Sequence, residues 1–91
     1  MEYRRVDHVV DAEVGDQVVA LDVEAGVYHH LNGTGAAIWN ELKQPRTLDD
    51  VSQALRARFS AAPGILEKEV QSFIDELIGK GILQASEQPG A

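Results

Sequence analysis

Two adjacent histidines, His29 and His30, are the side chains of this sequence best suited to bind a metal ion. They lie in the β-rich run Val27–Leu31, which predicts a strand. Because successive side chains of a strand point to opposite faces, the two imidazoles cannot easily hold one ion. The third histidine, His8, has no sequence feature that places it near them, and the chain has no cysteine. We therefore expect no metal site and no cofactor.

The segment of residues 31–35, Leu-Asn-Gly-Thr-Gly, lies between a predicted strand and a predicted helix, where phosphate-binding loops occur. It lacks the spacer and lysine of a Walker loop and the third glycine of a dinucleotide fingerprint. A turn followed by a helix N-cap, provided by Asn32 or Thr34, explains it better. No Ser, His and Asp arrangement has the local context of a catalytic site. A chain of 91 residues also leaves little room for a deep pocket, so we expect no enzymatic activity.

The charge balance narrows the classes of partner. Eight Lys and Arg residues against 15 Asp and Glu residues give a net charge of −7, which repels nucleic acid. No apolar run approaches the ~18 residues that a membrane span requires. A basic, apolar secretory signal is also missing, and we expect a cytoplasmic protein that is a monomer.

The elements that position these residues follow from periodicity. Three β-rich runs, around Val9, over residues 18–21 and over Val27–Leu31, predict a three-stranded antiparallel sheet. Gly26 ends the break before the third strand and suits a left-handed turn position. From Asn32 onward the apolar period changes from 2 to 3.6, which predicts helices.

Three helices are predicted after the sheet. Gly35, Ile38, Trp39 and Leu42 share one face of the first. Thr47 and Asp50 form a capping box at the start of the second, and Pro63 suits the first position of the third. We therefore expect an α+β, winged helix-turn-helix-like domain over residues 1–85, with a disordered tail over residues 86–91.

The third helix decides between two binding functions. Its apolar stripe is wider than a small core needs; its members are Leu66, Val70, Phe73, Ile74, Leu77 and Ile78. Its charged residues are mainly acidic, which disfavours the alternative of a helix-turn-helix DNA-binding regulator. An exposed edge of the third strand, beside this helix, instead predicts a groove that binds an extended peptide by backbone pairing.

Three segments resemble the PqqD-like family. Residues 27–39 match the pattern Y-x-x-L-N-x-T-G-x-x-I-W, and residues 45–51, Pro-Arg-Thr-Leu-Asp-Asp-Val, are similar to the family's entry into the second helix. Residues 69–83 resemble its closing D-V-x-x-F-x-x-x-L-x-x-x-G-L-L. The chain departs from the family at residues 60–64, where relatives often carry an acidic string.

The resemblance implies a recognition element for ribosomally made, modified peptides, which has no catalysis of its own. Such domains bind the leader of a precursor peptide in extended form and present the precursor to a processing enzyme. Within the family the chain is most similar to the B1 branch of lasso-peptide pathways, which delivers the precursor to a leader peptidase. The alternative branch is the pyrroloquinoline quinone-type peptide chaperone, which serves a radical enzyme.

The resemblance also implies a set of peptide-binding residues on the third strand and the third helix. We expect Val70 to be exposed in the groove, whereas core packing and groove lining remain open for Phe73 and Leu77. If Leu31 faces inward, Val27 and His29 face inward with it. The implied residues are Val27, Tyr28, His29, His30, Leu31, Glu69, Val70, Phe73, Glu76 and Leu77.

Overall fold

The computed structural model describes residues 1–59 and 64–86 of the chain. The strands in these residues are β1 (Glu2–Arg5), β2 (Val9–Val14), β3 (Gln17–Asp22), β4 (Val27–Leu31), β5 (Arg46–Thr47) and β6 (Leu83–Ser86). The helices are α1 (Gly33–Glu41), α2 (Leu48–Arg56) and α3 (Ile65–Gly79). None of these helices is long and apolar enough to cross a membrane.

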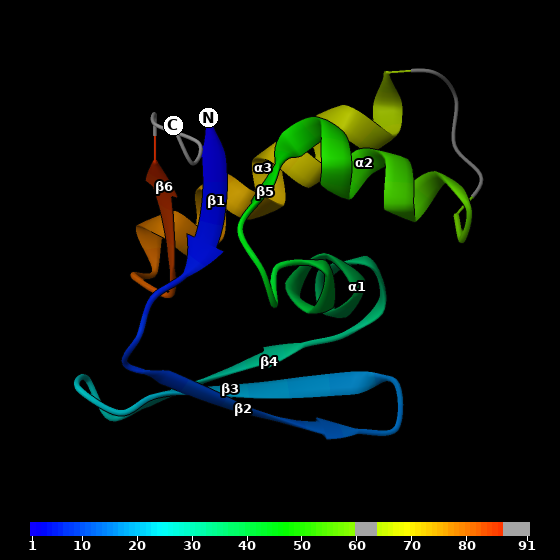
Figure 1. Ribbon diagram of the computed structural model, residues 1–91. Coiled ribbons are helices and arrows are strands. Elements are labelled where there is room, and N and C mark those ends of the chain that lie inside the picture. The colour runs from blue at the N-terminus through cyan, green and yellow to red at the C-terminus, as the bar shows by residue number, and fades with distance from the viewer. Residues whose placement is uncertain (60–63, 87–91) are drawn as a thin grey trace.

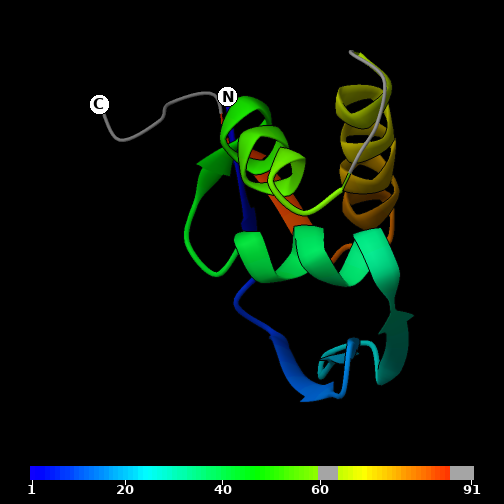
Figure 2. The same cartoon turned by 90° about the vertical axis from the view of Figure 1, so that its right-hand side faces the viewer.

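The molecule is built in layers around α1 (Figures 1 and 2). The antiparallel sheet β2-β3-β4 lies on one side of α1, and α2 and α3 lie on the other. The predicted order of three strands followed by three helices is confirmed, and the predicted third strand is β4. Because α1 has both layers as neighbours, its apolar residues have to serve two interfaces.

Turn residues explain where the sheet changes direction. Gly15, at φ 65°, and Asp16 make a two-residue turn between β2 and β3, whose register pairs Val14 with Gln17. Gly26, at φ 71°, ends the longer turn between β3 and β4 in the left-handed conformation, as predicted. A side chain at either glycine would be strained, since both have positive φ.

The helix caps agree with the sequence in one case and differ in the other. At the start of α2, Thr47 Oγ1 accepts from the Asp50 N–H (3.1 Å) and Asp50 Oδ2 accepts from the Thr47 N–H (3.2 Å), which confirms the capping box. Asn32 occupies the N-cap of α1, but its side chain makes no capping hydrogen bond. The predicted Pro63 start of the third helix lies outside the described residues.

A second, small sheet of order β5-β1-β6 was not predicted. Its central strand, β1, has the sequence Glu-Tyr-Arg-Arg, which carries no alternating apolar pattern. Its partners lie about half a chain and nearly a whole chain away in sequence, so local periodicity could not find them. Ser86 belongs to β6 and not to the predicted tail, of which residues 87–91 lie outside the described residues.

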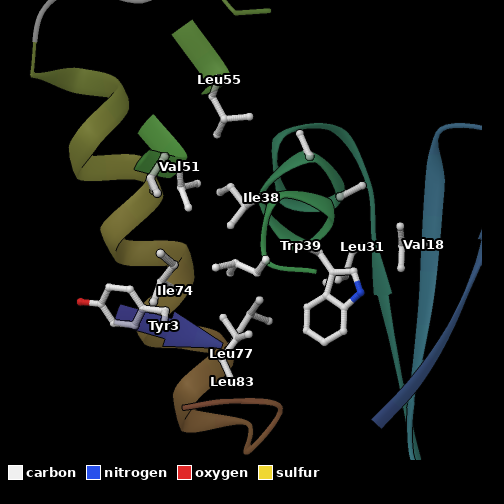
Figure 3. Close-up of a cluster of buried hydrophobic side chains, with 14 of the residues drawn as sticks. Tyr3, Val18, Leu31, Ile38, Trp39, Val51, Leu55, Ile74, Leu77 and Leu83 are labelled. Atoms are coloured by element: carbon white, nitrogen blue, oxygen red, sulfur yellow. The ribbon is translucent and has the colours of Figure 1, made fainter. Parts of the chain in front are cut away.

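One hydrophobic core joins all these layers (Figure 3). Ile38 and Trp39 are both fully buried, and they point from α1 in different directions. Ile38 faces Val51 and Leu55 of α2, whereas Trp39 lies toward Val18 and the sheet. Two consecutive large side chains of one helix therefore hold its two neighbouring layers.

A polar network around Trp39 connects both sheets to α1. The Trp39 Nε1–H donates to Asp11 Oδ2 of β2 (2.8 Å), and Arg5 Nη1 of β1 lies 3.2 Å from the same oxygen. Arg5 Nη2 also donates to the Trp39 carbonyl (2.7 Å), and its guanidinium stacks 4.3 Å from the centroid of the indole ring. Each strand is thereby tied to the helix by a hydrogen bond in addition to apolar packing.

This network predicts an unequal effect of two substitutions on β2. Asp11→Ala leaves the buried indole N–H without its acceptor and Arg5 Nη1 without its ion-pair partner, so we expect the free energy of unfolding to fall by about 1–3 kcal/mol. Glu13→Ala, on the same face of β2, removes an exposed ion pair with Lys43 and none of the hydrogen bonds around Trp39, so it should cost below about 1 kcal/mol. Urea denaturation of the two variants measures the difference, and equal losses would contradict a special role for the network.

Candidate functional site: the free edge of β4 beside α3

β4 is an edge strand. The order β2-β3-β4 leaves it paired with β3 on one side, and no other strand of the described residues adjoins its second side. It contains no proline that would block backbone pairing. An edge of this kind presents free N–H and C=O groups to an extended peptide.

The register identifies which backbone groups face the free edge. In a two-residue hairpin the residues flanking the turn form a hydrogen-bonded pair, so Val14 and Gln17 are such a pair, and the pattern alternates along the strands. Gln17 and every second residue after it in β3 therefore direct their backbone groups to β2. Val18, Ala20 and Asp22 direct their backbone groups to β4, where the partner of Val18 is Leu31.

It follows that alternate residues of β4 have different roles. Val27, His29 and Leu31 direct their N–H and C=O groups to β3, whereas those of Tyr28 and His30 point to the free edge. The hydrogen bond from the Val23 N–H to the His8 carbonyl (3.0 Å) agrees with this alternation, because Val23 continues the set that faces β2.

The side chains of β4 divide between two faces. Leu31 is buried opposite Val18, on the face toward α1, and Val27 and His29 share that face, as expected for an inward Leu31. Tyr28 and His30 point to the outer face, where Tyr28 is 64% exposed. His29 and His30 therefore lie on opposite faces of the strand, and no three His, Cys, Asp or Glu side chains within the described ranges gather to hold a metal ion.

One flank of α3 lies toward the junction of β4 and α1. The ring of Phe73 packs against the backbone of Gly35 in the first turn of α1, directly after β4. Glu69 and Glu76, four residues before and three after Phe73, share its flank and are exposed. On the opposite flank, the Gln71 Nε2 group donates to the Tyr3 hydroxyl of β1 (3.4 Å), which fixes the rotation of the helix.

Val70 and Leu77 of α3 both lie in the core, although the sequence predicted Val70 to be exposed in the groove. Both are fully buried and belong to the core, so the predicted groove exposure of Val70 is wrong. Phe73 is half-buried and is the apolar residue on the Glu69–Phe73–Glu76 flank of α3. The stripe of α3 is wide because the helix packs against α2 and β6 and also contacts α1 through Phe73, and a helix with neighbours on several sides needs more apolar surface.

The turn before β4 is held by Asp22. Its Oδ1 atom accepts from the N–H groups of Glu24 and Ala25 (3.0 Å each), and its carbonyl accepts from the Gly26 N–H (2.7 Å). The hydrogen bond from Ala25 is the main reason that the pKa of the Asp22 carboxyl lies below its usual value. His8, whose Nε2 lies 3.5 Å from Asp22 Oδ2, lowers this pKa further, against the opposing effect of burial.

A cavity of about 480 Å³ lies elsewhere, between the β2–β3 turn, α1 and the end of α2. None of the ten residues implied by the resemblance lines it. An extended peptide that pairs with a strand edge does not need a closed cavity. The β4 edge and the Phe73 flank of α3 are therefore the stronger candidate site.

Comparison with known protein families shows to which family the chain belongs. The model of a family described as coenzyme PQQ synthesis protein D (PqqD) matches residues 17–83, which is more than half of the chain. The chain belongs to the PqqD family. The matched residues run from the first residue of β3 to the first residue of β6, so they contain every element of the candidate site.

Two solved structures are similar to this PqqD-family chain over 93% of its length. One is described as "TbiB1 in Complex with the TbiA(beta) Leader Peptide", with 27% identity, a TM-score of 0.85 and 99% of that chain covered. The other is described as "Lasso peptide synthetase B1 complexed with the leader peptide", with 25% identity, a TM-score of 0.82 and full coverage of that chain. A search of curated proteins finds no significant match.

The sequence proposed this strand and this helix for the candidate site and expected pairing through alternate backbone groups, but it left open which residues of the strand face the free edge. The hydrogen-bonding alternation could have been derived from the Gly15–Asp16 turn, because a two-residue turn fixes the pattern through β3 to β4. The packing of Phe73 on Gly35 has no such signal, since the two residues lie on different helices.

The lowered pKa of Asp22 predicts a contribution to stability that depends on pH. The Asp22 carboxylate stabilises the fold above its ordinary pKa of about 3.9, and this stabilisation is lost as the pH falls from there through the lower folded-state pKa. Asp22→Asn should therefore make the unfolding temperature depend less on pH on the acid side. Thermal unfolding between about pH 2 and about pH 6 measures this dependence, because that range covers the titration of the carboxyl. Asp16→Asn in the other turn is the control. An Asp22→Asn variant as acid-sensitive as the wild type would contradict this role.

Proposed function

We propose that this chain binds the leader segment of a ribosomally made precursor peptide as an added strand along the free edge of β4, beside α3, and delivers it to a processing enzyme. The observation that carries the proposal is the free edge itself, in a PqqD-family chain whose fold matches two B1 proteins described in complex with leader peptides. Tyr28 and His30 supply the backbone groups.

The two sides of the bound leader meet different surroundings. Leader side chains on the inner face lie between Val27, His29 and Phe73, so apolar residues fit there. Glu69 and Glu76 add negative charge at the rim, where basic leader residues fit. Since an exposed ion pair contributes only about 0.2–1 kcal/mol, charge tunes this binding and backbone pairing carries it. Val70 and Leu77 act from the core, by supporting Phe73.

Strand pairing predicts a two-residue period along the leader, with the phase set by the register of β4. In an antiparallel complex, the leader residues opposite Tyr28 and His30 form hydrogen-bonded pairs, and their side chains lie on the outer face. N-methylation of those residues should weaken binding several-fold or more, because each lost hydrogen bond is worth about 0.5–1.5 kcal/mol. Alanine substitution should instead be most harmful at the intervening residues, whose side chains face α3.

Isothermal titration calorimetry with the cognate leader, taken from the precursor encoded beside the gene for this chain, measures both scans. If the positions sensitive to N-methylation alternate with those sensitive to alanine substitution, the leader pairs antiparallel to β4. If the two sets of positions coincide, it pairs as a parallel strand. A profile without a two-residue period would rule out strand addition. As the matched test on the protein, Tyr28→Pro removes an edge N–H and should weaken binding without breaking a bond to β3.

The outer face of the sheet supports the delivery step. It carries no formally charged side chain; its members are Val10, Ala12, Val14, Gln17, Val19, Leu21, Tyr28 and His30. Val10 and Val14 are 56% and 65% exposed, in a chain that is acidic overall. A leader strand beside β4 would extend this face with its own outward side chains. We infer that the processing enzyme docks on this combined surface, and a leader peptidase is the enzyme we favour.

Docking on the outer face predicts that leader binding and processing can be separated. Val10→Glu places a charge in the proposed interface and should slow leader removal by about ten-fold or more, since an unpaired charge is costly to bury. The affinity for the leader should not change, because Val10 lies on β2. Ala85→Glu is the control, because Ala85 is also exposed but lies on β6 of the small sheet, away from this face. Unaltered processing by the Val10→Glu variant would exclude this face.

The pyrroloquinoline quinone-type chaperone is the second candidate, favoured by the description of the matching family. It uses the same leader site and differs in the enzyme that receives the peptide. Supplying the leader-bound chain to a purified peptidase or to a radical enzyme separates the two. In both cases we infer that the chain itself catalyses no reaction.

A further inference from the structure

Gly35 and Phe73 make an unusually close contact between α1 and α3. A Cβ atom at Gly35 would lie 2.5 Å from Cζ and 2.8 Å from Cε2 of the Phe73 ring, which is closer than such atoms approach in proteins. The ring therefore occupies the space that any other residue at position 35 would fill. The backbone of Gly35 does not itself require glycine, because its φ is not positive.

The Phe73 ring is packed on its core side and partly exposed on the other. On the core side, Val70 and Leu77, the neighbours of Phe73 on α3, are fully buried and packed. Phe73 itself is half-buried, so its free side faces solvent, on the flank shared with Glu69 and Glu76. We therefore expect an atom added at Gly35 to displace the ring toward this exposed flank.

We propose that Gly35 is a positioning residue for leader binding, because it lets the Phe73 ring lie back against α1 and leaves the space beside the β4 edge open for an inward-facing leader side chain. This inference rests on the proposed function. Gly35 touches no part of the leader and acts only through Phe73. The depth available next to Leu31, and with it the size of the leader side chain accepted there, is set by this contact.

Gly35→Ala tests the inference directly. The added methyl group should displace the ring toward the leader and weaken binding of the cognate leader about ten-fold, as expected for an overpacked contact. The matched control is Gly79→Ala, because Gly79 is also helical and a Cβ there meets nothing within 4 Å. Both substitutions raise helix propensity, so a difference between them reports the contact and not the helix.

A double-mutant cycle separates displacement of the ring from a general disturbance of α1. Phe73→Leu removes Cε2 and Cζ, so adding Gly35→Ala to this variant should change leader affinity by less than about two-fold, the limit for sites without a remaining contact. Gly35→Ala that binds like the wild type overturns the inference. An equal loss of leader affinity when Gly35→Ala is added to the wild type and to Phe73→Leu also overturns it.

If Gly35→Ala alone does not fold, the double variant decides the question. Folding and leader binding equal to those of Phe73→Leu support the inference, and a double variant that also fails to fold overturns it. A wild-type chain that does not bind the cognate leader at all contradicts the proposed function. A wild type and a Gly35→Ala variant that bind it equally contradict only the role of Gly35.

Discussion

Backbone pairing on one side of β4 is the constraint on which the account depends. A strand that has a partner on only one side has alternate N–H and C=O groups without a strand partner, and in β4 these belong to Tyr28 and His30. Their side chains lie on the outer face, whereas the side chains that face α1 come from the intervening residues. One strand therefore serves the core, a free edge and an outer surface, and the alternation keeps these roles apart.

The rest of the fold holds this edge in place beside α3. Trp39 fills the space between α1 and the sheet, and Asp11 and Arg5 fix it by hydrogen bonds from two different strands. Asp22 fixes the turn that begins β4, and Gly35 lets α3 approach the turn of α1 that follows it. The two ends of β4 are thus held by different interactions, which leaves its edge free without leaving the strand loose.

Local signals predicted most of the fold. Gly26 and the Thr47–Asp50 capping box marked element boundaries correctly, because turns and caps depend on neighbouring residues alone. Contacts between distant segments were not predictable: β1 and β6 pair across almost the whole chain, and nothing local distinguishes the buried Val70 from the half-buried Phe73. Family resemblance proposed the strand and helix of the candidate site, whereas the register showed which backbone groups of the strand face its free edge.

Amide hydrogen exchange of β4 tests the central claim most directly. In the free chain, the amides of Tyr28 and His30 should exchange quickly and that of His29 slowly, because among these three residues only His29 directs its N–H to β3. Saturation with the cognate leader should slow exchange at Tyr28 and His30 and leave His29 almost unchanged. A bound leader that leaves the Tyr28 and His30 amides in fast exchange would contradict the account, because it would then bind without pairing to the edge of β4.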